Sequence, residues 1–189
     1  MKVRIKKILP TNLFALVLLM WGVFIVNFLI PFIDLNNFGI RPRQSFGLVG
    51  VITSPFLHGN LAHIIANTFG LLVCGALLRV SYSKANFYKI IILGIFLSGL
   101  LTWTFSSSGV VIGASGLVFC FIGILLANAF FKPSILSWAL AFMCLFFYSG
   151  AVLSLLSVQQ GISWAGHFSG LASGVVMSFM LNKYPKWIL

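Results

Sequence analysis

The chain has 189 residues, of which 60% are hydrophobic and only 7% are charged, and its mean hydropathy is +1.11. A soluble domain of this size could not stay in solution with that composition, so the sequence predicts an integral membrane protein. The net charge of +11 comes from basic residues that sit singly or in short clusters between apolar runs. This distribution is typical of topology signals and excludes a nucleic-acid-binding protein.

Acidic residues and cysteines narrow the chemistry further. Asp34 is the only acidic residue, which excludes paired catalytic carboxylates, HExxH zinc sites and carboxylate proton relays. We expect no metal and no other cofactor. The cysteines Cys74, Cys120 and Cys144 all fall inside apolar runs and are odd in number. We therefore expect packing residues and not a disulfide framework.

Charged and Pro/Gly-rich breaks divide the chain into apolar runs of the length that crosses a bilayer. The predicted spans are residues 12–33, 60–78, 87–105, 115–131, 134–156 and 165–182, each bound being approximate. The expected fold class is an all-α membrane protein with six transmembrane helices. Every polar stretch is too short for an independent core, so residues 1–189 form one predicted domain. No small-residue cleavage site follows the first run, and we expect that span to be retained.

The basic residues fall almost entirely on one side of these spans. That side carries Lys2, Arg4, Lys6, Lys7, Arg79, Lys84, Lys89, Lys132, Lys183 and Lys186. The opposite side carries only Arg41 and Arg43, both in the long first loop. The positive-inside rule therefore predicts that both termini are cytoplasmic.

Polar residues gather at the starts of three spans. The segment HGNLAHIIANTFG opens the second span, with His63 and Asn67 spaced to lie on one helical face. The segments VIGASGLVF and SWAGHFSGLASG open the fourth and sixth spans with Ser115 and His167. Because these spans run in the same direction, the four residues share a similar depth and are expected to meet.

This set contains the parts of a serine hydrolase. Ser115 would be the nucleophile and His167 the general base, and no carboxylate is available to make a triad. The oxyanion would be held by the Ser115 backbone N–H at a helix N-terminus, together with His63 and Asn67. Each of these residues alone has a structural alternative, since Ser and Asn commonly join transmembrane helices and His63 could be a hydrogen-bonded helix linker.

Glycines indicate how the fourth and sixth spans meet. Gly166, Gly170 and Gly174 recur at every fourth position, a ridge that lets helix backbones approach closely. Gly113 and Gly116 flank the serine of the fourth span. If Ser115 is catalytic, these glycines support the site. If it is not, they form an ordinary small-residue contact between transmembrane helices.

The segments HGNLAHIIAN, GASG and GHFSG resemble the rhomboid family of intramembrane serine proteases, in the family's order and on the expected spans. The resemblance implies a rhomboid-like bundle in which Ser115 and His167 form the catalytic dyad, with His63 and Asn67 at the oxyanion. It implies cleavage of transmembrane proteins near the outer membrane face, in the inner membrane of a bacterium. The expected partners are these substrates and membrane lipid, without an obligate subunit. The segment 39–60 resembles first loops that lie partly in the outer leaflet.

Two positions depart from the family pattern. Phe119 stands where Tyr is frequent, and we expect it to pack beneath the His167 ring without offering a hydroxyl. Gly166 stands where Ala is common before the histidine. The first loop also lacks an obvious Trp-Arg pair found in some members, so its geometry is not carried over.

Two other classes of function remain open. A non-catalytic rhomboid-like protein would bind client transmembrane segments, and it would need neither Ser115 nor His167. A channel or transporter is disfavoured because the sequence lacks the charged residues or evident inverted repeat that would mark an ion or substrate path. We expect His58 to cap the second span or to face water. The fifth-span aromatics, expected to face lipid or to pack and by analogy to form a lateral gate, are Trp138, Phe142, Phe146 and Phe147.

Overall fold

The computed structural model describes residues 11–30, 32–107, 109–153, 155 and 163–183. In that part of the chain every regular element is a helix, and one isolated β-bridge joins Ile40 and Val111. The α-helices are α1 (Thr11–Leu29), α2 (Gly50–Thr53), α3 (Leu61–Ser81), α4 (Lys84–Phe105), α5 (Ser115–Phe131), α6 (Ile135–Leu153) and α7 (Trp164–Lys183). The six long helices lie over the predicted spans. Residues 31, 154 and 156 of those spans lie outside the described residues, as do Lys2, Arg4, Lys6, Lys7 and Lys186.

The length and hydropathy of the helices can be compared with the prediction of six transmembrane spans. Within the described residues, α3, α4 and α6 are long and apolar enough to cross a membrane. The apolar stretches of α1 and α5, Leu13–Leu29 and Ser115–Phe131, are shorter. The count of six spans and the cytoplasmic termini therefore stay predictions.

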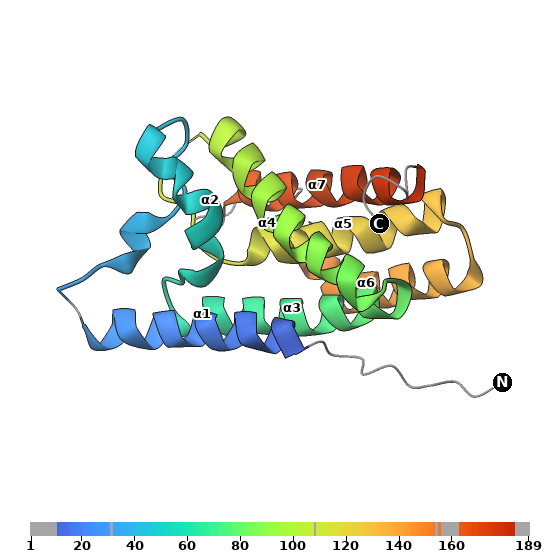
Figure 1. Cartoon of the computed structure of the whole chain (residues 1–189), viewed down its shortest axis with the longest axis horizontal. Coiled ribbons are helices and arrows are strands. Elements are labelled where there is room, and N and C mark those ends of the chain that lie inside the picture. The colour runs from blue at the N-terminus through green and yellow to red at the C-terminus, as the bar shows by residue number, and fades with distance from the viewer. Residues whose placement is uncertain (1–10, 31, 108, 154, 156–162, 184–189) are drawn as a thin grey trace.

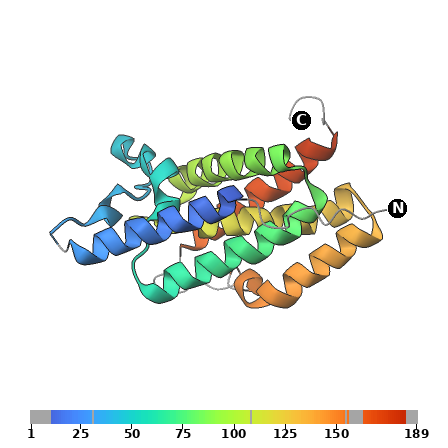
Figure 2. The ribbon, with the colours of Figure 1, turned by 60° about the horizontal axis from the view of Figure 1, so that its bottom comes forward.

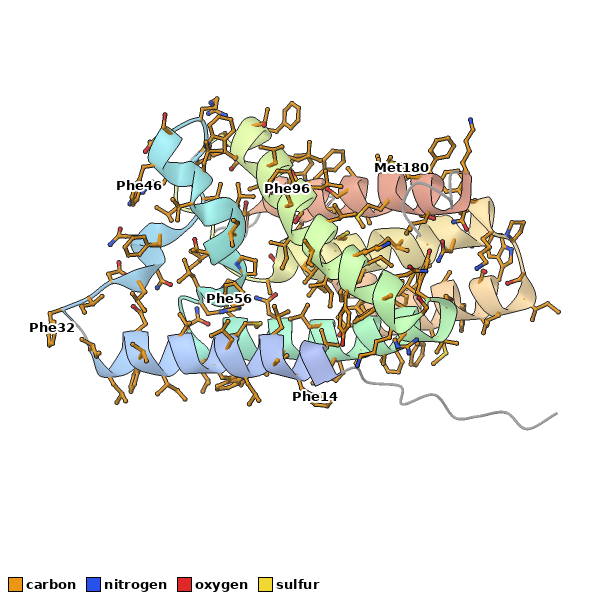
Figure 3. The ribbon with its side chains drawn as sticks, in the orientation of Figure 1. Phe14, Phe32, Phe46, Phe56, Phe96 and Met180 are labelled. Atoms are coloured by element: carbon orange, nitrogen blue, oxygen red, sulfur yellow. The ribbon has the colours of Figure 1, made fainter. Side chains whose placement is uncertain are left out.

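Helix α5 runs through the centre of the bundle, with α3, α4, α6 and α7 packed around it (Figure 1). Most of its residues are buried, including Phe121, Ile122 and Leu125. Large apolar side chains on the outer helices point away from the bundle, as Phe14 on α1 and Met180 on α7 do on opposite sides (Figure 3). Cys74, Cys120 and Cys144 are free and buried, which confirms the prediction of packing residues.

Helices α5 and α7 touch through their backbones. A Cβ on Gly170 would lie 2.2 Å from the Gly116 carbonyl oxygen, and one on Gly174 would lie 2.2 Å from that of Cys120. Real Cβ atoms do not come so close, so only glycine fits at these two positions. The predicted ridge is therefore seen at Gly170 and Gly174, while Gly166 at its end faces the Ser163 hydroxyl instead.

The loop that joins α1 to α3 is fastened to the end of α4. Arg43, in a left-handed conformation with φ of 57°, donates from its guanidinium to the carbonyls of Thr104 and Ser106. The Trp103 indole donates to the Gln44 carbonyl at 2.9 Å. An arginine at these carbonyls satisfies groups that the end of α4 leaves unpaired. Figures 1 and 2 show this loop at the end of the bundle where α3, α5 and α7 begin.

Candidate active site

A cavity of about 400 Å³ opens at the end of the bundle where α3, α5 and α7 begin. The four residues that the sequence singles out, Ser115, His167, His63 and Asn67, all line it. They come from three helices that are adjacent in space, since α5 packs against both α3 and α7. The expected meeting of these residues in one place is therefore observed.

The turn before α5 brings Ser115 against α3. Gly113 has φ of +109°, and its N–H donates to the Ser54 carbonyl at 2.8 Å. A Cβ on Gly113 would lie 2.5 Å from His63 Nε2 and 3.2 Å from Asn67 Nδ2. Both the backbone conformation and the close approach require glycine here. Ser115 then begins α5, where the first backbone N–H groups have no partner within the helix.

His63 and Asn67 lie one turn apart on α3. The N-cap residue Asn60 fixes the start of this helix, because its side-chain oxygen accepts the His63 N–H at 2.9 Å. Asn67 is only 4% exposed, and no group among the described residues bonds its Nδ2. A buried amide donor without an acceptor is uncommon. Next to Gly113, this donor is ready to bind an oxygen atom of a bound molecule.

His167 lies in the first turn of α7, where its N–H donates to the Ser163 carbonyl at 3.1 Å. Its ring stacks on Phe119 with ring centroids 4.2 Å apart. Phe119 and Ser115 are one turn apart on α5, so the stack holds the His167 ring over the helix that carries the serine. Within the described residues no hydrogen bond joins the Ser115 hydroxyl to this ring. Such bonds often form only once substrate is bound.

His58 was expected to cap the second span or to face water, and the structure shows neither. Asn60 caps α3, and His58 is 2% exposed, so it neither caps the helix nor faces water. Its ring packs against His63, with centroids 5.0 Å apart and planes at 65°. Burial, and to a smaller extent the neighbouring His63, lower the pKa of His58 to about 4. The sequence offered one indication of this contact, which is that His58 and His63 are five residues apart at the start of a helix.

Tyr148 is a cavity residue that sequence reasoning missed. It interrupts α6 with a non-helical backbone (φ −125°, ψ 17°) and lines the cavity beside His167. Its ring lies 6.2 Å from that of Phe69 on α3. The neighbouring aromatics that the sequence singled out are on the outer surface, with exposed fractions of 53% for Trp138, 70% for Phe142, 73% for Phe146 and 49% for Phe147.

Comparison with known proteins finds a matching family and several relatives. Residues 45–184 match the Rhomboid domain family. The "Uncharacterized protein Rv1337" of Mycobacterium tuberculosis is 37% identical over 159 residues, which are 79% of this chain and 65% of that protein. The "Uncharacterized protein ML1171" of Mycobacterium leprae is 34% identical over 79% of this chain and 62% of its own length.

A more distant relative comes from a plant. The "RHOMBOID-like protein 4" of Arabidopsis thaliana is 26% identical over 137 residues, 72% of this chain and 35% of that protein. The chain thus spans less than two thirds of the length of the relatives it matches. Because the family match covers most of the chain and the helices are apolar, this integral membrane protein belongs to the rhomboid family.

Proposed function

We propose that the protein is an intramembrane serine endopeptidase that uses Ser115 as nucleophile and His167 as general base. The observation that carries the proposal is that both residues line one cavity together with the unpaired amide of Asn67. A packing patch has no need for a buried donor without a partner, whereas an oxyanion site does. His63 and the start of α5 would complete the set of donors.

The proposed reaction proceeds in two halves. The Ser115 hydroxyl attacks the scissile carbonyl as His167 takes its proton, and the C–N bond then breaks as His167 returns that proton to the leaving amine. Water releases the acyl group from Ser115 by the same proton transfers in reverse order. In both halves the oxyanion is stabilised by the Ser115 backbone N–H, Asn67 and His63.

The proposed substrate is a transmembrane segment cut near the outer face of the membrane. A second hollow of about 640 Å³ adjoins the cavity and shares Asn60, His63, Ile112 and Ser163 with it. Together they provide room for an extended stretch of peptide. A helix shields its own carbonyls, so the segment must unwind, and small helix-breaking residues near the cut would favour this. We further propose that both termini are cytoplasmic and that the membrane is a bacterial inner membrane.

The test compares the wild type with Ser115→Ala and His167→Ala in liposomes that contain a single-span reporter protein. A fluorophosphonate probe that acylates active serines gives a second readout. Ser81→Ala is the matched control, because Ser81 ends α3 at the far end of the bundle. We expect the wild type and the control to cut and to be labelled, Ser115→Ala to lose both, and His167→Ala to lose cleavage.

Two other results would point elsewhere. Equal cleavage by all four proteins would place the activity outside Ser115 and His167. If no reporter is cut and no probe is bound, capture of transmembrane client proteins becomes the better proposal, and crosslinking of the reporter in Ser115→Ala and wild type alike would support it.

A further inference from the structure

His58 lies near the cavity, and the proposed chemistry does not explain its position. It lies in the short connection before α3, which begins at Leu61. The side chain is 2% exposed, and among the described residues neither ring nitrogen makes a well-formed hydrogen bond, although the Phe56 backbone lies close enough to raise the pKa of the ring slightly. A buried polar ring without hydrogen bonds is destabilising unless another contact compensates.

The aromatic contact of His58 is with His63. The two rings meet edge to face, with centroids 5.0 Å apart and an angle of 65° between their planes. Aromatic rings attract each other in this geometry because the edge of one carries partial positive charge and the face of the other partial negative charge. The pKa of about 4 keeps His58 neutral at ordinary pH, so the two rings do not repel each other as cations.

The His63 ring depends on such contacts for its orientation. Its backbone N–H is bonded to Asn60, but no hydrogen bond to the ring itself is seen among the described residues. One side of the ring faces Gly113, where His63 Nε2 occupies the space that a Cβ would need. His58 supplies the ring contact on α3's N-terminal side. Without it, rotation of the ring would move Nε2 away from Gly113.

We infer that His58 is a positioning residue, which holds the His63 ring in the orientation that directs Nε2 toward the turn of Gly113 and Ser115. This inference rests on the proposed function, because it gives His63 the role of an oxyanion donor. His58 contributes no proton and touches no substrate. Its contribution is the aromatic edge, so another aromatic side chain of similar size should replace it.

The variants that test this are His58→Phe, which keeps an aromatic edge, and His58→Leu, which keeps only the bulk. We expect His58→Leu to lower kcat for reporter cleavage about 3- to 10-fold with KM unchanged, because only the transition state is affected. His58→Phe should retain most of the wild-type kcat. Loss of kcat in both variants would show that the aromatic edge is not what matters and would overturn the inference.

A double-mutant cycle separates positioning from general stability. In a His63→Ala background, His58→Leu should have no further effect on kcat, whereas it should still change thermal unfolding by as much as it does alone. Equal kcat losses in both backgrounds would mean that His58 acts independently of His63 and would overturn the inference.

A third measurement does not depend on activity. The chain has three histidines, so their labelled side-chain NMR signals in nanodiscs can be assigned by substitution. The His63 signal should shift or broaden in His58→Leu and stay in place in His58→Phe. An unchanged signal in both variants contradicts the inference. A wild type that neither cuts nor labels contradicts the proposed function instead, which keeps the two failures distinct.

Discussion

The ring of His167 lies flat on the ring of Phe119, with centroids 4.2 Å apart and planes 18° apart. The resemblance to the rhomboid family led to the expectation that Phe119 packs beneath this histidine. The stack sets the height and tilt of the imidazole above α5 without any hydrogen bond from the phenyl ring. Its loss should therefore loosen the proposed base while leaving its chemistry unchanged.

Substitution of Phe119 tests this role. Phe119→Leu should lower kcat about 2- to 10-fold, since an aromatic pair contributes roughly 0.5–1.5 kcal/mol beyond its buried area. Phe119→Tyr should keep the stack and stay within about 2-fold of the wild type. Steady-state cleavage of the reporter in liposomes measures both. Equal activity of all three proteins would show that the stack does not position the histidine.

Gly113→Ala should abolish activity. Its Cβ would lie 2.5 Å from His63 Nε2, and its φ of +109° is strained for any other residue. Displacing the proposed oxyanion donors should lower kcat by about 100-fold or more. Gly109→Ala is the matched control, because Gly109 also has positive φ (+73°) but nothing lies within 4 Å of the added Cβ. The control should lose about 1–2 kcal/mol of stability. Its kcat at saturating reporter should stay at the wild-type value, and only KM should change, because Gly109 lines the hollow proposed for the peptide. Similar kcat losses in both variants would mean that backbone strain alone is responsible.

Local sequence patterns were sufficient for the helices and for the four cavity residues. The apolar runs predicted the long helices, and polar residues at the starts of three runs predicted Ser115, His167, His63 and Asn67. The three runs were predicted to cross the membrane in the same direction, so their first residues were predicted to lie at one depth. That prediction needed only the number and order of the apolar runs. Whether the same four residues catalyse a reaction is a separate question that the cleavage experiment addresses.

Contacts between distant segments were beyond sequence reasoning. Arg43 and Trp103 fasten the first loop to α4, but they are far apart in the chain, and no periodicity links a loop residue to a helix end. The burial of His58 depends on how the connection before α3 folds back. Tyr148 reaches the cavity because α6 is interrupted at that residue, and no proline marks the interruption.

Gly170→Ala should separate α5 from α7. The new Cβ would lie 2.2 Å from the Gly116 carbonyl oxygen and 2.9 Å from Phe119 Cβ, so backbone must move. We expect a loss of about 1–3 kcal/mol in the free energy of unfolding and a lower kcat, because Phe119 supports His167. Gly22→Ala is the control on α1, where nothing lies within 4 Å, and it should be neutral or slightly stabilising. Unfolding in mixed detergent micelles measures both, and a stable Gly170→Ala protein would contradict the close packing.

A buried polar cluster far from the cavity offers a test of stability without function. Asn128 Oδ1 accepts hydrogen bonds from the Tyr82 hydroxyl at 3.0 Å, the Ser178 hydroxyl at 2.9 Å and the Asn182 amide at 3.3 Å. These donors join α5 to α7 and to the connection after α3. Asn128→Leu would leave them without this acceptor.

We expect Asn128→Leu to lower the free energy of unfolding by about 2–3 kcal/mol, because buried donors lose their partner. Asn182→Leu removes the longest of the three bonds together with the bond of that amide to the Ser178 carbonyl at 2.7 Å. It leaves the Tyr82 and Ser178 donors paired with Asn128, so it should lower the free energy of unfolding by less than Asn128→Leu does, about 1 kcal/mol. Cleavage per folded molecule should match the wild type in both variants, since the cluster lies at the other end of α5 from Ser115. If Asn128→Leu is fully folded in the assay and its kcat is still reduced, this end of the bundle also affects catalysis at the cavity.

Acid should destabilise the protein through His58. Burial and the neighbouring His63 lower its pKa from the ordinary 6.5 to about 4, so between these values the unfolded chain binds a proton that the folded protein does not. The stability that the neutral ring provides is fully present above pH 6.5 and is lost as the pH falls toward 4. Between these limits the free energy of unfolding should fall by up to about 3 kcal/mol more for the wild type than for His58→Phe. Reversible unfolding in detergent micelles at several pH values measures the difference, and parallel curves for the two proteins would show that His58 titrates normally in the folded state.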